Sequence, residues 1–213
     1  MRMKIRWLFI CLAILGACRV FEKTSAPDNK STTGKTTPTN GAGGASSARA
    51  VQAFDQVISA TAEPELRRQL EDYKQKGIGL PLDTKAVTPD MVIKTAETYI
   101  GTPHKGGGRD RKGMDCAGLV SVALEAHGIN LRGSSNSLGR FGMVINDQKD
   151  LKRGDLVFFV RTYSAKEVLT HSGIYTGNDK FIHTSSSKGV IISNFKDQSY
   201  WQPHYAFATR IFN

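Results

Sequence analysis

Residues 22–50 contain no large apolar side chain, and this gap limits the part of the chain that can build a hydrophobic core. Ser, Thr, Gly, Ala, Pro, Asn and Lys make up most of the segment. Such a composition buries too little apolar surface to offset the entropy lost on folding. We therefore predict a disordered tether over residues 18–50. The residues after it are enough for one ordinary domain.

The amino-terminal residues have the pattern of a secretory signal, predicted to span residues 1–17. Basic residues at 2, 4 and 6 precede the apolar run Trp7–Leu15, which is too short to cross a bilayer as a mature helix. The run leads into the letters LGAC, residues 15–18, which resemble the bacterial lipobox. That resemblance implies cleavage before Cys18, acylation of Cys18 and a lipid anchor in the cell envelope. An ordinary signal peptide with an incidental Cys is the alternative.

Arg19 bears on which membrane would hold the anchor. In the lipoprotein sorting rule, an Asp after the acylated Cys indicates inner-membrane retention. Arg19 therefore favours the outer membrane if the cell has two membranes.

The formal net charge of +10 raises nucleic acid as a partner. Three of these charges lie in the predicted signal segment, and residues 88–213 hold 16 basic and 11 acidic side chains. No Lys/Arg run there is longer than two, and aromatic residues do not alternate with basic ones. We therefore expect no nucleic-acid partner. With only three Cys, the chain is also neither a disulfide-dense scaffold nor a CxxC metal ribbon.

Residues 51–87 are predicted to form a helical arm that packs on the domain. Apolar residues at helical spacing form two stripes, with a break near Pro64 and an end at Gly77. The stripes are Val51, Phe54, Val57 and Ile58, then Leu66, Leu70 and Tyr73.

The compact domain is predicted over residues 88–213. Thr88 as N-cap and Pro89 at the first helical position begin a helix that stops near Gly101. Its expected buried face is Val92, Ala96, Tyr99 and Ile100. A second helix is expected to be capped by Asp115 and to close near Gly128.

From residue 151 onward, period-two alternation and short apolar runs indicate strands. We predict five of them, over residues 155–160, 171–177, 180–186, 189–195 and 204–212. Turns rich in Gly, Asn and Asp suit antiparallel neighbours. Two helices followed by a run of strands indicate the α+β class.

Cys116 is the one thiol away from the amino-terminal segment, and it lies in the first turn of a predicted helix. A helix start favours a thiolate and offers backbone donors to an oxyanion. His171 begins one predicted strand and His183 lies in the next, so the two can face each other. A buried structural Cys and surface His residues remain the alternatives.

Several segments together resemble the NlpC/P60 family of papain-like cysteine peptidases, in particular cell-wall endopeptidase lipoproteins. They read IGTPHKGGG, KGMDCAGLV, DLKRGDLVFF, THSGIYTGNDKFIHTSSSKGVIIS and the closing FATRIF, and the resemblance as a whole covers residues 88–212. The resemblance implies a papain-like fold, Cys116 as nucleophile, His171 as general base and then acid, and His183 as the residue that holds the His171 ring. It also implies hydrolysis of peptidoglycan stem peptides without metal or cofactor. The formal net charge of +5 over residues 88–213 suits an acidic peptide substrate. We also expect the protein to be a monomer.

Two positions depart from the family pattern. The family has a Tyr twelve residues before the nucleophile, thought to help bind the oxyanion, and this chain has His104 there. We predict that the imidazole donates in its place, with a sharper pH dependence. The family's LPRTS-like segment is LRGSS at residues 131–135, which leaves Arg132 and Ser134 as candidates for binding a peptide carboxylate.

Other functions remain open at this point. One is a wall-binding lipoprotein without catalysis on the same fold. A second is a zinc site made of Cys116, His171 and His183, which has suitable ligand types but no local ligand spacing. A third uses the same Cys/His pair for acyl transfer or for small amide substrates.

Overall fold

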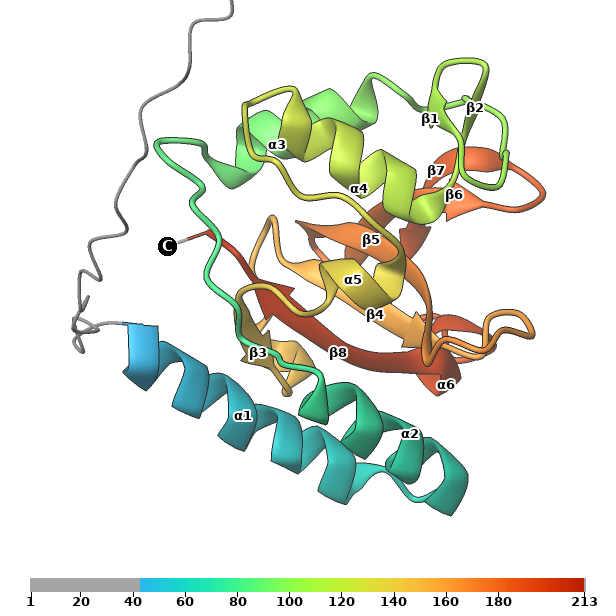
Figure 1. The fold of residues 1–213 in the computed structure, drawn as a ribbon. Coiled ribbons are helices and arrows are strands. Elements are labelled where there is room, and N and C mark those ends of the chain that lie inside the picture. Colours follow the sequence, from blue (N-terminus) through green and yellow to red (C-terminus); the bar gives the residue numbers. More distant parts are fainter. Residues whose placement is uncertain (1–42, 213) are drawn as a thin grey trace, which may run out of the picture. The chain divides into compact units, whose positions relative to one another are not determined.

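The structure, a computed structural model, describes residues 43–212 (Figure 1). The predicted signal segment, Cys18 and most of the predicted tether lie outside these residues. The helices are α1 (Gly43–Ala60), α2 (Pro64–Gln75), α3 (Pro89–Glu97), α4 (Cys116–Glu125), α5 (Ser135–Leu138) and α6 (Trp201–His204). The strands are β1 (Arg109–Asp110), β2 (Gly113–Met114), β3 (Met143–Ile145), β4 (Leu156–Val160), β5 (Leu169–Gly177), β6 (Lys180–Ser185), β7 (Gly189–Asn194) and β8 (Tyr205–Arg210). None of the helices described here is long and apolar enough to cross a membrane.

Six strands form one antiparallel sheet in the order β3-β8-β4-β5-β6-β7, and β1 pairs only with β2. The α+β class is confirmed, and the five predicted strands are present with ends within two residues of those predicted. The sixth strand, β3, is too short at three residues to give a recognisable alternation in the sequence.

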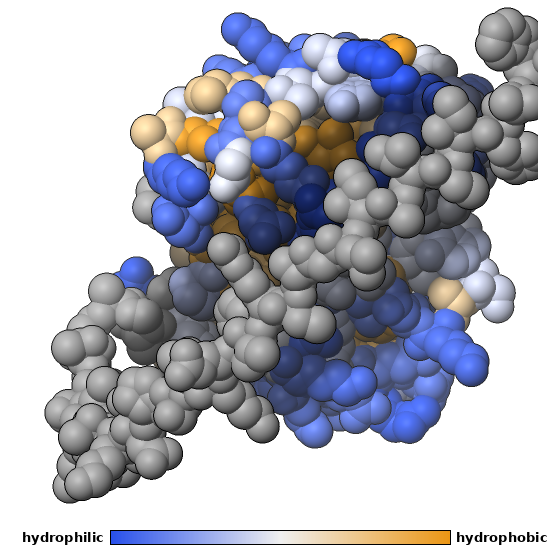
Figure 2. All heavy atoms as spheres, turned by 45° about the horizontal axis from the view of Figure 1, so that its top comes forward, coloured by the Kyte–Doolittle hydropathy of each residue, from blue (hydrophilic) through white to orange (hydrophobic). Residues whose placement is uncertain are grey.

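Apolar side chains pack against both faces of the sheet. All five residues of β4 are buried. Phe158 belongs to the larger core, which includes residues of α3 and α4, whereas Phe159 belongs to a smaller aromatic core. Successive side chains of a strand point to opposite faces, so β4 carries both cores. Figure 2 shows one face of the molecule, on which hydrophilic residues predominate and apolar residues are seen mainly between them.

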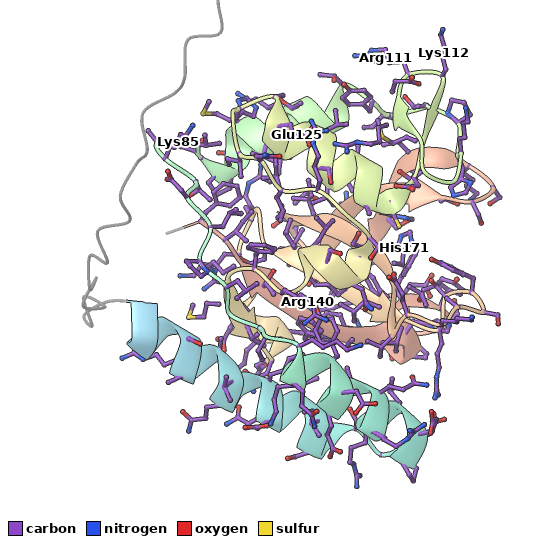
Figure 3. All side chains as sticks on the ribbon, viewed as in Figure 1. Lys85, Arg111, Lys112, Glu125, Arg140 and His171 are labelled. Atoms are coloured by element: carbon purple, nitrogen blue, oxygen red, sulfur yellow. The ribbon has the colours of Figure 1, made fainter. Side chains whose placement is uncertain are left out.

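The predicted helical arm is present and packs beside β3 and β8 (Figure 1). Pro64 is the first residue of α2, at the predicted break. Phe54 and Tyr73 are buried, and the Phe54 ring meets the Phe207 ring of β8 edge-on at 4.9 Å. Arg140, from the segment after α5, places its Cζ 4.2 Å from the centre of the Tyr73 ring (Figure 3). The arm is thus part of the larger core.

Two predictions about the start of the arm are wrong. Residues 43–50 are helical, not part of a disordered tether, and Ala50 is fully buried. This end of the segment is rich in Ala, which favours helix, and a side chain at Gly79 would collide with Ala50. The second wrong prediction concerns Val51, which is predicted to lie on the buried stripe and is 36% exposed. Ala50 lies four residues before Phe54 and occupies the buried face of the helix in place of Val51.

α3 starts where predicted but ends earlier. Thr88 precedes it in an extended conformation, although the Thr88 hydroxyl makes no capping hydrogen bond. The helix ends at Glu97 and turns follow, so the helical spacing does not continue. Ile100, predicted to be buried, is therefore 51% exposed.

Candidate active site

Cys116 is the first residue of α4, and Asp115 caps this helix as predicted. The Asp115 carboxylate accepts hydrogen bonds from the backbone N–H of Gly118 at 2.5 Å and of Gly107 at 2.7 Å. It thereby satisfies one free donor of the helix start and ties the glycine-rich loop to it.

His171 on β5 and His183 on β6 lie on the same face of the sheet. Ile174 pairs with Ile182, which makes the two histidines diagonal neighbours across the strands. Their rings are hydrogen-bonded, with 2.9 Å between His171 Nε2 and His183 Nδ1. Gly173 permits this approach, because a side chain there would lie 2.7 Å from the Ile182 carbonyl oxygen and 3.1 Å from His183 Cβ.

Aromatic rings fix the planes of both histidines. His183 stacks on Phe181, with ring centres 4.6 Å apart and an angle of 19° between the planes. Trp201 stacks on His171 at 5.4 Å and meets His183 edge-on at 4.7 Å. The other nitrogen of His183, Nε2, lies 2.8 Å from Ser193 Oγ.

The environment of Cys116 keeps the thiol protonated. Burial raises the pKa of the thiol above its usual value, and a hydrogen bond with Ser135 offsets this only in part. The sulfur lies 3.7 Å from Ser135 Oγ, and the Ser135 hydroxyl donates to Ser172 Oγ at 3.1 Å. Desolvation of the sulfur thus opposes the effect expected of the helix start and is the larger influence on the pKa of the thiol.

Both imidazoles are kept uncharged at neutral pH. Burial, then His183 and then His104 hold the pKa of His171 well below its usual value. Burial lowers the pKa of His183 to about 4. The resting site is thus a thiol beside a neutral imidazole pair, and a neutral imidazole has the free lone pair that a general base needs.

The depressed pKa values predict that the protein loses stability in acid. An unfolded His titrates near pH 6.5, so the unfolded state binds more protons than the folded state between about pH 6.5 and 4. The free energy of unfolding should fall as pH drops through this window, by about 2–3 kcal/mol for His183 alone, from the difference between its pKa of about 4 and the usual value. Urea unfolding at pH 7.5 and 4.5 measures the change. If the free energy of unfolding of His183→Gln falls as much between these pH values as that of the unaltered protein, the loss does not arise from His183.

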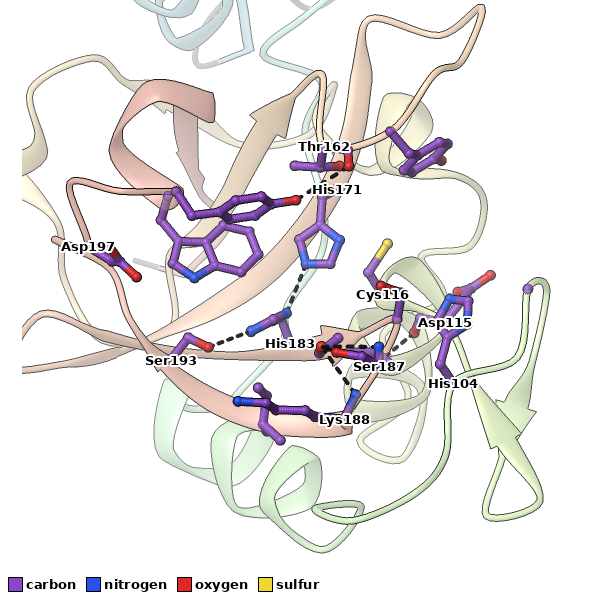
Figure 4. Close-up of a pocket in the computed structure, with 18 of the residues that line it drawn as sticks. His104, Asp115, Cys116, Thr162, His171, His183, Ser187, Lys188, Ser193 and Asp197 are labelled. Carbon is purple, nitrogen blue, oxygen red and sulfur yellow. Dashed lines mark hydrogen bonds between the residues drawn. The ribbon is translucent and has the colours of Figure 1, made fainter.

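Cys116, His171, His183 and His104 line one pocket of about 830 Å³ (Figure 4). The other lining residues are Gly106, Gly107, Asp115, Thr162, Tyr163, Thr184, Ser185, Ser186, Ser187, Lys188, Ile191, Ser193, Asp197, Tyr200 and Trp201. Trp201, Ser193 and Lys188 also line the pocket and carry no predicted role from the sequence. The position of Ser193 is predictable, since period-two alternation puts the side chains of Ile191 and Ser193 on one face of β7.

Two predicted substrate-binding residues lie outside this pocket. Arg132 forms an ion pair with Glu125 in a separate surface hollow, and Ser134 Oγ donates to Glu167 at 3.2 Å. The short helix α5 begins at Ser135, and it is this next residue that contacts the Cys116 sulfur.

Two of the three candidate zinc ligands, His171 and His183, are hydrogen-bonded to each other, and the Cys116 sulfur contacts Ser135 Oγ. Zinc needs about 2.0–2.1 Å to each imidazole nitrogen, and the facing nitrogens of His171 and His183 are only 2.9 Å apart. Across residues 43–212, no group of three or more His, Cys, Asp or Glu side chains is arranged to hold a metal ion.

Known proteins resemble this chain in sequence and in fold. The NlpC/P60 family matches residues 101–210. The "Probable endopeptidase NlpC homolog" of Haemophilus influenzae is 36% identical over 164 residues, covering 73% of this chain and 85% of that protein. The "Murein DD-endopeptidase MepS/Murein LD-carboxypeptidase" of Escherichia coli is 37% identical over 112 residues, which cover 52% of this chain and 56% of that protein.

Two further matches extend over a smaller share of longer proteins. The "Gamma-DL-glutamyl hydrolase" of Bacillus subtilis is 34% identical over 139 residues, covering 62% of this chain but only 33% of that protein. A solved NlpC/P60 family protein from Bacillus cereus superimposes with a TM-score of 0.55 and 28% identity, over 62% of this chain and 42% of that one.

Proposed function

Because this chain belongs to the NlpC/P60 family, we propose that it is a cysteine endopeptidase that hydrolyses peptide bonds of peptidoglycan. The observation that carries the proposal is the pocket in which the Cys116 thiol lies with the hydrogen-bonded pair His171 and His183. A relative named as a murein endopeptidase supports a cell-wall peptide as substrate.

The uncharged resting site favours general-base catalysis over a preformed ion pair. His171 Nδ1, which lies on the side of Cys116 in Figure 4, takes the thiol proton as the sulfur attacks the peptide carbonyl carbon. His171 then returns this proton to the leaving amine as the C–N bond breaks, which leaves an acyl-enzyme on Cys116. Water attacks the thioester with His171 again as base, and the carboxyl product and free thiol result.

The oxyanion of the tetrahedral intermediate needs two hydrogen-bond donors. The backbone N–H of Cys116, at the start of α4, is one candidate. His104 is the second; it is exposed at the pocket and lies close enough to affect the titration of His171.

His104→Phe is expected to lower kcat by about 10²-fold, the usual cost of removing one oxyanion donor. His104→Tyr should restore most of the activity, and its rate should change less between pH 5 and 8, because a phenol does not titrate in this range and an imidazole does. Initial rates of muropeptide release across this range test the prediction. Full activity of His104→Phe from pH 5 to 8 would remove His104 from the mechanism.

Lys188 is the one Lys or Arg among the described residues that line the pocket, and it is exposed. We expect it to attract the carboxylates of an acidic stem peptide. Lys188→Glu should lower kcat/KM several-fold at low ionic strength and less in high salt, because salt screens exposed charges. Lys180→Glu makes the same charge change outside the pocket and is the matched control. Equal losses in both variants would indicate a general charge effect.

We further propose that the protein is a lipoprotein of the cell envelope, acylated at Cys18. The LGAC letters at residues 15–18 support this. Mass spectrometry of the amino-terminal peptide from detergent-extracted protein should find diacylglycerol on the Cys18 thiol. A peptide that retains residues 1–17, or an unmodified Cys18, would refute it.

Digestion of purified peptidoglycan by the full chain tests the proposed reaction. Hydrolysis adds one water to each cleaved bond, and the masses of the fragments identify the bond. A product that carries an added amine in place of water would instead indicate acyl transfer by the same Cys/His pair.

A further inference from the structure

Ser193 on β7 extends the hydrogen-bonded histidine pair by one more side chain. In the pairing of β6 with β7, Ile191 lies opposite His183 and Ser193 lies opposite Phe181. Ser193 is therefore a diagonal neighbour of His183 on the same face of the sheet. Its Oγ is 2.8 Å from His183 Nε2, while His183 Nδ1 is 2.9 Å from His171 Nε2 (Figure 4).

The proposed chemistry fixes where the protons of this chain must lie. To accept the Cys116 proton, His171 must have a free lone pair on Nδ1, so its own proton is on Nε2. His171 Nε2–H then donates to His183 Nδ1, and His183 carries its proton on Nε2. That proton points at Ser193 Oγ, which must accept it.

The opposite arrangement would disable the base. If the Ser193 hydroxyl donated to His183 Nε2, the proton of His183 would move to Nδ1. His171 Nε2 would then have to accept, and its proton would move to Nδ1, the atom required to take the thiol proton. The direction of the Ser193 hydrogen bond thus decides whether His171 can act.

We propose that Ser193 is a positioning residue that accepts the His183 Nε2–H and thereby holds both histidines in the tautomers that catalysis needs. The inference rests on the proposed function. Ring stacking on Phe181 and Trp201 fixes the ring planes but does not distinguish which nitrogen is protonated. Only hydrogen bonding can make that distinction.

The charged and titratable groups around the histidine pair do not replace Ser193. The pocket also contains His104, Asp115, Lys188 and Asp197, and two tyrosines, Tyr163 and Tyr200. Asp115 is engaged by backbone N–H groups of the glycine loop and α4, and Asp197 by Ser199. Burial lowers the pKa of His183, and a backbone hydrogen bond with Thr184 raises it by less. Among the described residues, the side-chain hydrogen bonds of the two rings are those to each other and to Ser193.

The test compares Ser193→Ala with Ser193→Thr in the full chain. Nitrogen-15 NMR of labelled imidazoles reports the tautomer of each His without substrate. In the unaltered protein and in Ser193→Thr, His183 should carry its proton on Nε2. In Ser193→Ala, the Nδ1–H form should appear, and kcat should fall about tenfold with KM unchanged, as expected for the loss of one hydrogen bond. Ser193→Thr should recover most of that kcat.

Two results would overturn the proposal. One is a Ser193→Ala protein in which His183 stays in the Nε2–H form and kcat is within twofold of the unaltered protein. The other is an equal loss of kcat in the Ala and Thr variants with the tautomer unchanged, which would mean that the side chain matters only for packing. Because NMR reads the tautomers without turnover, failure of the proposed function would be seen separately, either as no muropeptide release by the unaltered protein or as release that survives Cys116→Ala.

Discussion

Cys116→Ala is expected to abolish muropeptide release from purified peptidoglycan, with a loss in kcat/KM of about 10⁴-fold or more. The methyl group cannot bond to the substrate carbonyl, and His171 is left with no proton to take. Removing a nucleophile leaves only the weak rate acceleration that binding and oxyanion donors supply. Chromatography and mass spectrometry of the digest, with equal amounts of each protein, measure the effect.

A folded control makes this loss interpretable. Although the sulfur is desolvated, Cys116 as a whole residue is partly exposed and Ala removes only the sulfur, so the replacement should change the free energy of unfolding by about 1 kcal/mol or less. Cys116→Ser keeps the size of the side chain and should also be nearly inactive, because a hydroxyl is a far weaker nucleophile than a thiol at neutral pH. Urea unfolding of the three proteins confirms that they are equally folded.

The same variant separates the competing functions. A wall-binding protein without catalysis would bind peptidoglycan equally well with Cys or Ala at position 116 and would release nothing in either form. A zinc enzyme would lose activity in chelator and regain it with added zinc. Unchanged release by Cys116→Ala would contradict the cysteine mechanism itself.

The part of the site on the β5–β6 hairpin is predictable from the sequence, because local rules determine it. Gly177, Asn178 and Asp179 all adopt positive φ, which is what a tight hairpin turn between twisted strands requires. Once the turn is fixed, period-two alternation brings His171 and His183 to one face. The N-cap at Asp115, one residue before the nucleophile, follows equally from local chemistry.

Features that depend on packing between distant segments are not predictable in this way. The four-residue helix α5 is too short for a periodic pattern, so nothing in the sequence distinguishes Ser134 from Ser135 as the residue that meets Cys116. The pKa of the thiol depends on how far the sulfur is desolvated, and this outweighs the helix start that the sequence reveals. The buried face of α1 likewise depends on Gly79, which lies in a distant segment and contacts Ala50.

Phe54→Ala is expected to lower the free energy of unfolding of the whole domain by about 3–5 kcal/mol, the range for removing a buried aromatic ring. The Phe54 side chain is fully buried, and its ring lies 4.9 Å from Phe207 of the central sheet and 5.7 Å from Tyr73 of α2. Its loss would leave a cavity between the arm and β8. The higher helix propensity of Ala offsets only a small part of this cost.

Urea unfolding followed by circular dichroism measures this change, with Val51→Ala as the matched control on the same helix. Val51 is 36% exposed, so its truncation should cost within about 0.5 kcal/mol. No residue of the arm lines the Cys116 pocket, so Phe54→Ala should keep its kcat at temperatures where it remains folded. A loss below about 1 kcal/mol would mean that the arm docks only loosely. A fall of about 3–5 kcal/mol in the free energy of unfolding would mean that α1 and α2 fold and unfold together with the rest of the domain. Removing one ring from the arm would then also destabilise the sheet that carries the histidines.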